Sequence, residues 1–281
     1  MTTSAVQELD ALVGLVGDRD VVQLGQLLRH GTQHYRTAPP FMRSLTNMLG
    51  EDLGSIPGQS SAISGASDQF SMGTHTGSHM DFLNHISHER KLFDGTCIDD
   101  PGVQDWSRGI FMHSQAAYRP IVSRGVLLDF TAAHGVVALP RETELTPADM
   151  EDCARTLGVE VRAGDTVLVR TGWDTYLDDD ELYLKMPIPG PGWEAAQWLV
   201  DKGIVATGAD TMPYEAAPGS RPMEPHAILI PKNGVFIFEM LDLRELAARK
   251  VYEFLFMALP LRLEGCTGSP VNPVALVPST T

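Results

Sequence analysis

A short stretch of the 281-residue chain, Met72 to His88, holds most of its potential chemistry. Four side chains that can bind a metal ion or carry a proton, His75, His79, Asp81 and His85, fall within eleven residues there. Imidazole and carboxylate together are the ligand set of Zn²⁺, Mn²⁺ and Fe²⁺, whereas Mg²⁺ and Ca²⁺ sites are built mostly from oxygen. The stretch therefore predicts a transition-metal site.

The spacing of these side chains restricts the backbone that carries them. On a helix, Asp81 would lie about 240° round from His75 at about 100° per residue, so the ligands could not converge. In a strand the even offsets place all four on one face, but residues four apart would sit about 13 Å from each other. The chain must therefore start extended and then bend, and Gly77-Ser78 is the expected bend because glycine is free in φ.

The run His-Thr-Gly-Ser-His-Met-Asp-Phe-Leu-Asn-His, residues 75–85, resembles the His-x-Gly-Thr-His-x-Asp-x-Pro-x-His signature of a family of metal-dependent hydrolases. This is the cyclase family, the superfamily of kynurenine formamidase and isatin hydrolase. Ser78 replaces Thr and keeps the hydroxyl, while Leu83 replaces Pro and argues against kynurenine formamidase itself. Similar segments recur at 124–129, at the Thr-Gly-Trp ending in Trp173, and at 259–271. The resemblance implies a swivelling β/β/α architecture and a homo-oligomer.

A strand–helix alternation along the chain predicts the α/β class, and we expect a single domain over residues 1–281 with a mixed sheet. Thr146, Pro147 and Gly158 are typical start and stop residues for a helix over 147–157. Further helices are expected at about 4–16 and 192–202. Strands are expected at 21–24, 62–71, 124–130, 166–171, 204–210, 235–240 and 252–263.

The composition of the chain restricts the kinds of molecule that it is expected to bind. A formal charge of −15 and a pI near 4.9 oppose binding to nucleic acid or an anionic membrane and favour a small-molecule substrate. Cys97, Cys153 and Cys266 have no CxxC spacing, so neither a disulfide framework nor a cysteine zinc site is indicated. No signal-peptide pattern and no membrane-length apolar run is present, so we expect a cytoplasmic protein. A homodimer or higher homo-oligomer is expected, since symmetric dimers are the commonest assemblies.

Two downstream residues are candidates to complete the metal site. Glu239 interrupts an apolar strand, where an unpaired carboxylate would be costly, so a cationic group should meet it. The alternative is an ion pair with an Arg or Lys in the sheet. The resemblance implies that His226 and then Glu239 join the metal site; otherwise His226 is an ordinary loop histidine beside a proline.

The predicted function is hydrolysis of a small, cyclic or aryl amide or formamide. One or two ions of Zn or Mn, held by His75, His79, Asp81, His226 and Glu239, would activate water and polarise a carbonyl. The resemblance implies that His85 transfers protons, a role that suits histidine near neutral pH.

Phe82, Trp106 and Trp173 are candidates for a flat wall against an aromatic substrate. Two alternatives stay open. One is a lactone or ester hydrolase on the same site, because carbonyl polarisation does not distinguish C–N from C–O cleavage. The other is an inactive metal-binding protein, against which the proton carrier His85 argues. The sequence contains no Gly-x-Ser-x-Gly motif, so it does not indicate a hydrolase with a serine nucleophile.

Overall fold

The fold was analysed in a computed structural model that describes residues 13, 16–17, 19–35, 38–50, 63–114 and 118–279. Of the helix expected at 4–16, only residues 13 and 16 are described, and both are helical. The rest of that prediction lies outside the described residues, as does Ala62, the first residue of the expected strand at 62–71.

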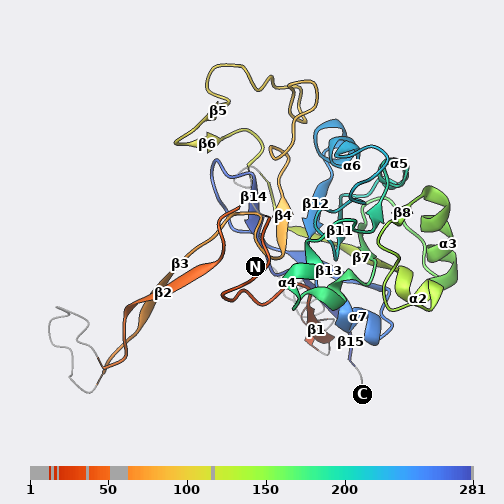
Figure 1. The fold of residues 1–281 in the computed structure, drawn as a ribbon, viewed down its shortest axis with the longest axis horizontal. Coiled ribbons are helices and arrows are strands. Elements are labelled where there is room, and N and C mark those ends of the chain that lie inside the picture. Colours follow the sequence, from red (N-terminus) through yellow and green to blue (C-terminus); the bar gives the residue numbers. More distant parts are fainter. Residues whose placement is uncertain are drawn as a thin grey trace, which may run out of the picture.

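A nine-stranded mixed sheet organises the described part of the chain, in the order β1-β15-β13-β7-β9-β11-β12-β4-β14 (Figure 1). Its four central neighbours β7, β9, β11 and β12 run parallel, and the flanking strands pair antiparallel. The strands are β1 (Arg19–Gln23), β4 (His79–Asp81), β7 (Ile121–Asp129), β9 (Thr166–Arg170), β11 (Ala206–Ala209), β12 (Phe236–Glu239), β13 (Glu253–Ala258), β14 (Gly268–Pro270) and β15 (Val274–Pro278).

Three small two-stranded sheets accompany the main one. They pair β2 (Met42–Asn47) with β3 (Ser67–Ser71), β5 (Gln104–Asp105) with β6 (Gly109–Ile110), and β8 (Glu144–Leu145) with β10 (Gly190–Pro191). The β2–β3 hairpin projects away from the main sheet (Figure 1). It was not expected as a hairpin: only its second strand was predicted from the sequence.

Helices cover both faces of the sheet. They are α2 (Phe130–His134), α3 (Pro147–Leu157), α4 (Asp180–Tyr183), α5 (Trp193–Asp201), α6 (Glu224–Ala227) and α7 (Arg244–Ala248), with a 3₁₀ turn at Trp173–Tyr176 and a π turn at Ile228–Lys232. One apolar core packs α3, α5 and the π turn against β7 and β9, through residues such as Met150, Leu199 and Val167. A second core, around Phe238, Phe256 and Leu246, lies on the opposite face under α7.

The helix and strand predictions are confirmed for the central elements. Helix α3 has the predicted bounds. Thr146 and Asp149 form a capping box at its start, and Gly158, with a left-handed backbone at φ 72°, ends the helix. Helix α5 and strands β7, β9, β11 and β12 lie within a few residues of their predicted ranges. Strand β13 is shorter than the expected 252–263, because Leu259 onward leaves the sheet. No described helix has the length and apolar character that a membrane crossing requires.

Candidate metal centre

Strand β4 supplies the centre of the site. It lies between β12 and β14, and its three residues are buried. His79 and Asp81 are two residues apart, so they project from the same face of the sheet. Gly77, just before the strand, has φ 64°, and a Cβ there would come within 2.7 Å of the Leu28 side chain. The predicted bend at Gly77-Ser78 is therefore present, and it folds the preceding loop with His75 back over the strand.

Asp81 is the point at which the ligands meet. His75 Nδ1 lies 2.8 Å from Asp81 Oδ1, and His79 Nε2 lies 3.5 Å from the same oxygen. His226 Nε2, from α6, lies 3.5 Å from Asp81 Oδ2. Both Asp81 oxygens are buried, and neither has a hydrogen-bond partner in suitable geometry. A buried carboxylate without partners is costly, so the arrangement calls for a cation.

Glu239 faces this centre from the next strand. It is the cross-strand partner of His79 in the β12–β4 register, and the two side chains approach to 3.4 Å. Glu239 Oε1 also lies 3.4 Å from His226 Nε2 and accepts a hydrogen bond from the Tyr214 backbone N–H at 2.8 Å. No Arg or Lys among the described residues pairs with Glu239, so the alternative of a sheet ion pair finds no partner here.

The ring nitrogens are oriented for metal binding. His79 donates its Nδ1 hydrogen to the Gly77 carbonyl oxygen at 2.8 Å, which leaves Nε2 facing Asp81 and Glu239. His226 donates from Nδ1 to Glu215, which leaves its Nε2 facing the same carboxylates. Ligating histidines in proteins bind the metal through one nitrogen and hold the other by a hydrogen bond of this kind.

The spacings also fit a small divalent ion. Ligands at about 2.0–2.1 Å from a tetrahedral Zn²⁺ lie about 3.3 Å apart, close to the observed nitrogen–oxygen distances. Two sets of side chains have ligand atoms within 4.8 Å of one another. One is His75, His79 and Asp81; the other is Asp81, His85 and His226. Because Asp81 belongs to both, the residues fit one ion or two ions that share this carboxylate.

Protons compete with a metal ion for the nitrogen and oxygen atoms of these side chains. Burial opposes protonation of His79, but the carboxylates of Asp81 and Glu239 outweigh it and raise its pKa from 6.5 to about 10. Burial likewise disfavours the charge on Glu239, yet His226 and His79 lower its pKa to about 2. Metal binding would displace the imidazole protons, because a ligating nitrogen must be unprotonated.

His85 lies beside the ligands but in a different environment. Its ring centroid is 4.2 Å from that of His75 and 6.3 Å from that of His226. Burial lowers its pKa from 6.5 to about 4, the effect of burial exceeding the opposing attraction of Asp81. His85 is therefore neutral at pH 7 and free to accept a proton, as a general base requires.

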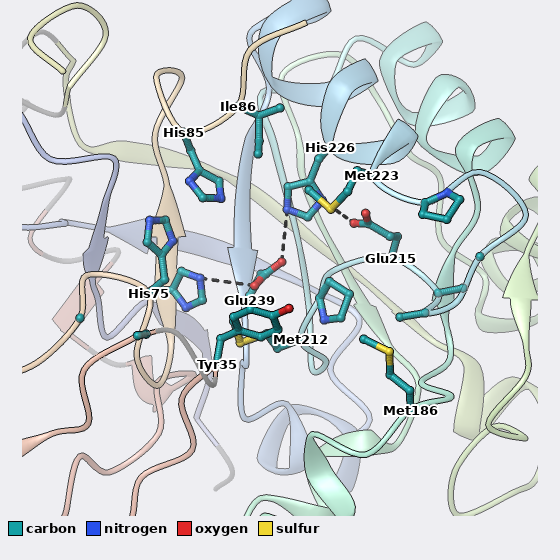
Figure 2. A pocket seen from close by; sticks show the side chains of 18 of the residues that line it. Tyr35, His75, His85, Ile86, Met186, Met212, Glu215, Met223, His226 and Glu239 are labelled. Carbon is teal, nitrogen blue, oxygen red and sulfur yellow. Dashed lines mark hydrogen bonds and ion pairs between the residues drawn. The ribbon is translucent and has the colours of Figure 1, made fainter. Parts of the chain in front are cut away.

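A cavity of about 710 Å³ opens on this cluster (Figure 2). His75, His79, His85, His226 and Glu239 all line it. The three aromatic residues that were expected to line a substrate pocket, Phe82, Trp106 and Trp173, are not among the residues lining this cavity. Phe82 and Trp173 are fully buried in the apolar cores, and Trp106 is fully exposed, so the prediction of an aromatic wall is not supported.

Several lining residues were missed in the sequence. Glu215 is buried, binds His226 through Oε2, and has no partner for its Oε1. An acid in the otherwise apolar run Met212–Ala217 was the available signal. The remaining wall is mainly aliphatic, and its sequence carries no comparable signal: Ala38, Pro39, Ile86, Met186, Met212, Pro213, Ala216, Ala217, Pro218, Pro222 and Met223.

Comparisons with known proteins show which family and fold the chain resembles. The Cyclase family model matches residues 22–216. Isatin hydrolase from Roseibium aggregatum is 32% identical over 127 residues, which cover 42% of this chain and 47% of that protein. The matched part thus spans about half of this curated relative's length.

Solved structures share the fold. A structure described as a novel cyclase superposes with a TM-score of 0.80 at 22% identity, covering 99% of this chain and 92% of the other. Isatin hydrolase A from Ralstonia solanacearum superposes with a TM-score of 0.73 at 24% identity, covering 99% of both chains. At these identities the likeness establishes the mixed α/β fold with a large curled sheet.

Proposed function

The chain belongs to the cyclase family, and we propose that it is a metal-dependent hydrolase that cleaves the C–N bond of a small amide. The observation that supports this most strongly is Asp81, a buried carboxylate with no hydrogen-bond partner in suitable geometry, among three imidazoles that line a cavity. The similarity to isatin hydrolase points to the same class of reaction.

His75, His79 and Asp81 would hold a divalent transition metal, Zn or Mn, with His226 and Glu239 completing its shell or binding a second ion. Such an ion, when bound, activates water and polarises a carbonyl oxygen. The site's mixed nitrogen and oxygen donors suit these metals better than Mg²⁺ or Ca²⁺.

His85 would carry the proton. It is neutral at pH 7 because burial lowers its pKa to about 4, and it lines the cavity where a substrate would lie. In the reaction, water oxygen adds to the carbonyl carbon while His85 accepts a water proton. The C–N bond then breaks, and His85 returns the proton to the leaving nitrogen, so that an acid and an amine are formed.

The experiment combines metal analysis with hydrolysis of a panel of aryl formamides, cyclic imides and lactones. We expect metal in the purified protein, hydrolysis of at least one C–N substrate, and loss of activity on treatment with a chelator that is reversed by Zn²⁺ or Mn²⁺. Hydrolysis of lactones alone would assign the site to C–O bonds instead. Full metal loading without hydrolysis of any compound would favour a metal-binding protein that is not an enzyme.

A further inference from the structure

The cavity above the metal centre is lined by a polar cluster and by an apolar wall. Figure 2 shows His75, His85 and His226 around Glu239, with Met223 beside His226 and Met186 farther from the histidines. The charged and imidazole side chains that line the cavity, among the described residues, all belong to the polar cluster: His75, His79, His85, Glu215, His226 and Glu239.

Three methionines from separate segments form much of the apolar wall of the cavity. Met186 follows α4, Met212 follows β11, and Met223 directly precedes α6. Met186 is 53% exposed and Met223 is 46% exposed, so both leave apolar surface uncovered where they line the cavity. Exposed apolar surface of this kind marks a binding site, because burying it against a ligand is favourable.

The apolar wall of the cavity offers an anion no fixed cationic side chain among the described residues. Glu215 and Glu239 are acidic, and no Lys or Arg is among the lining residues that the structure describes. A substrate carboxylate held against the apolar wall would lose its hydration without gaining a described cationic side chain there, which is unfavourable. The described part of the cavity therefore favours an uncharged substrate body at the apolar wall.

Methionine walls do not require a flat substrate. The methionine side chain has three rotatable bonds and a polarisable sulfur, so it adapts to ligands of irregular shape. The expected aromatic wall is absent: among the residues lining the cavity, Tyr35 is the one Phe, Tyr or Trp that the structure places there. Planar stacking is thus a minor part of what this cavity offers.

We propose that the substrate of this site is an amide with an uncharged, bulky apolar body, aliphatic as readily as aryl, which Met186, Met212 and Met223 enclose while the carbonyl faces the histidines. The inference rests on the proposed hydrolase function, and it adds the substrate class. A volume of about 710 Å³ leaves room for such a body beyond the reacting amide group.

The first test compares three formamides: formanilide, N-cyclohexylformamide and 2-formamidobenzoate. We expect kcat/KM for the flat and the non-flat neutral compounds to agree within about 10-fold, because adaptable walls accept both. The carboxylate-bearing compound should be poorer than formanilide by at least about 100-fold. Preferential hydrolysis of 2-formamidobenzoate would overturn the substrate class while leaving the hydrolase function intact.

The second test changes the methionines. Met186→Ala and Met223→Ala should each raise KM for N-cyclohexylformamide about 10-fold and should raise KM for N-methylformamide much less, since a small substrate makes fewer contacts with that wall. Met186→Leu and Met223→Leu should stay within about 3-fold of the wild type, because volume is conserved. Met48→Ala, a half-exposed methionine beyond β2, is the matched control. Equal effects on the large and small substrates would contradict the inference.

A binding measurement separates the two proposals. Calorimetry of the metal-free protein with acetophenone and with benzoate compares a neutral and an anionic ligand without hydrolysis. Acetophenone binding that is weakened by Met186→Ala, with benzoate binding at least about 10-fold weaker, supports the substrate class even if no amide is hydrolysed. Equal binding of the two ligands, binding of neither, or acetophenone binding that is insensitive to the methionines would overturn it.

Discussion

Asp81 Oδ2 lies 3.5 Å from His226 Nε2, although the two residues belong to β4 and α6 on distant parts of the chain. The contact is close but is not a hydrogen bond, since neither Asp81 oxygen has a partner. The His226 Nδ1 hydrogen is directed to Glu215, so Nε2 is the ring nitrogen that faces Asp81. Such a pair becomes favourable when a cation lies between the two groups.

The first prediction concerns metal content. His79→Ala removes an imidazole that faces both Asp81 and Glu239, so we expect the purified variant to lose most of its metal. His134→Ala, which replaces an exposed histidine at the end of α2, should keep the wild-type content. Elemental analysis of the three proteins provides the measurement. Equal metal in His79→Ala and the wild type would remove His79 from the site.

The second prediction concerns Glu215 as a positioning residue. Glu215→Gln weakens the acceptor that holds the His226 ring, so metal affinity should fall about 10- to 100-fold. Affinity is measured by competition with a chelator, which does not depend on activity. Glu224→Gln, on α6 but paired with Lys232 at its surface, is the matched control and should bind metal as the wild type does.

A double-mutant cycle tests whether Glu215 acts through His226. In a His226→Ala background, Glu215→Gln should cause no further loss of metal affinity. Additive losses in the double variant would show that Glu215 stabilises the fold or binds the metal by another route.

The parts of the site that the sequence predicted are those that depend on local spacing. The even offsets of His79 and Asp81 place them on one face wherever that strand pairs, and Gly77 identifies the bend. Glu239 stood out because a carboxylate in an apolar strand needs a partner, and the β12–β4 register puts it opposite His79. Participation of His226 and Glu239 in metal binding stays a prediction until metal analysis tests it.

The parts that the sequence did not predict depend on how distant segments meet. Glu215, Met186 and Met223 come from loops, and their common orientation follows from the crossover connections of the sheet. A tryptophan can lie in a core or line a pocket, so the residue type alone did not decide the role of Trp173. Its indole N–H donates to the Tyr183 carbonyl at 2.8 Å and its ring packs beneath Arg141, so it is used in the core.

The third prediction concerns stability and pH. Asp210 is fully buried and accepts hydrogen bonds from the Thr171 N–H and hydroxyl at 2.9 Å each. Burial, and then the charge of Asp174, raise its pKa from 3.8 to about 7. Between about pH 4 and 7 the folded state therefore keeps a proton that the unfolded state has lost. This group's contribution to stability is present at low pH, falls as the pH rises through that window, and is constant above it.

Asp210→Asn removes this titration. The unfolding free energy of the wild type minus that of the variant should fall by at most about 1.4 kcal/mol per pH unit from pH 4.5 to 7. Urea unfolding of the metal-free proteins provides the measurement. Val137→Ala, which replaces an exposed apolar residue without a titratable group, should give a difference that does not change with pH. A pH-independent difference for Asp210→Asn as well would contradict the raised pKa.

The fourth prediction concerns the oligomer. The β2–β3 hairpin forms a sheet of its own and exposes Leu45 and Phe70 by 54% and 60%. A two-stranded hairpin with an apolar surface is marginally stable in water unless another surface packs on it. We expect a second copy of the chain to do so, giving a dimer. Light scattering should report about twice 30.6 kDa.

Phe70→Asp should shift this mass toward a single chain, because a charge in the interface would be buried without a partner. Val137→Asp, which replaces an exposed apolar residue outside the hairpin, should leave the mass unchanged. A wild-type mass of about one chain would refute the dimer.

The last prediction concerns His85. If His85 transfers protons and is not an essential ligand, His85→Ala should keep its fold and most of its metal while kcat falls about 10²- to 10⁴-fold. Loss of kcat/KM should come mainly through kcat, because the interaction is made in the transition state. The neighbouring His88→Ala, whose side chain does not line the cavity among the described residues, is the matched control and should retain activity.

Metal analysis of His85→Ala distinguishes the two roles that the geometry allows. Because His85 also belongs with Asp81 and His226 to a set of possible ligands, loss of metal from the variant would reassign it as a ligand. In the wild type, burial lowers the pKa of His85 to about 4, so its base form is retained until the pH falls toward that value. Activity of the wild type should therefore decline on that acidic side, and His85→Ala should lack this limb. Unchanged activity in His85→Ala would rule out the proton-transfer role.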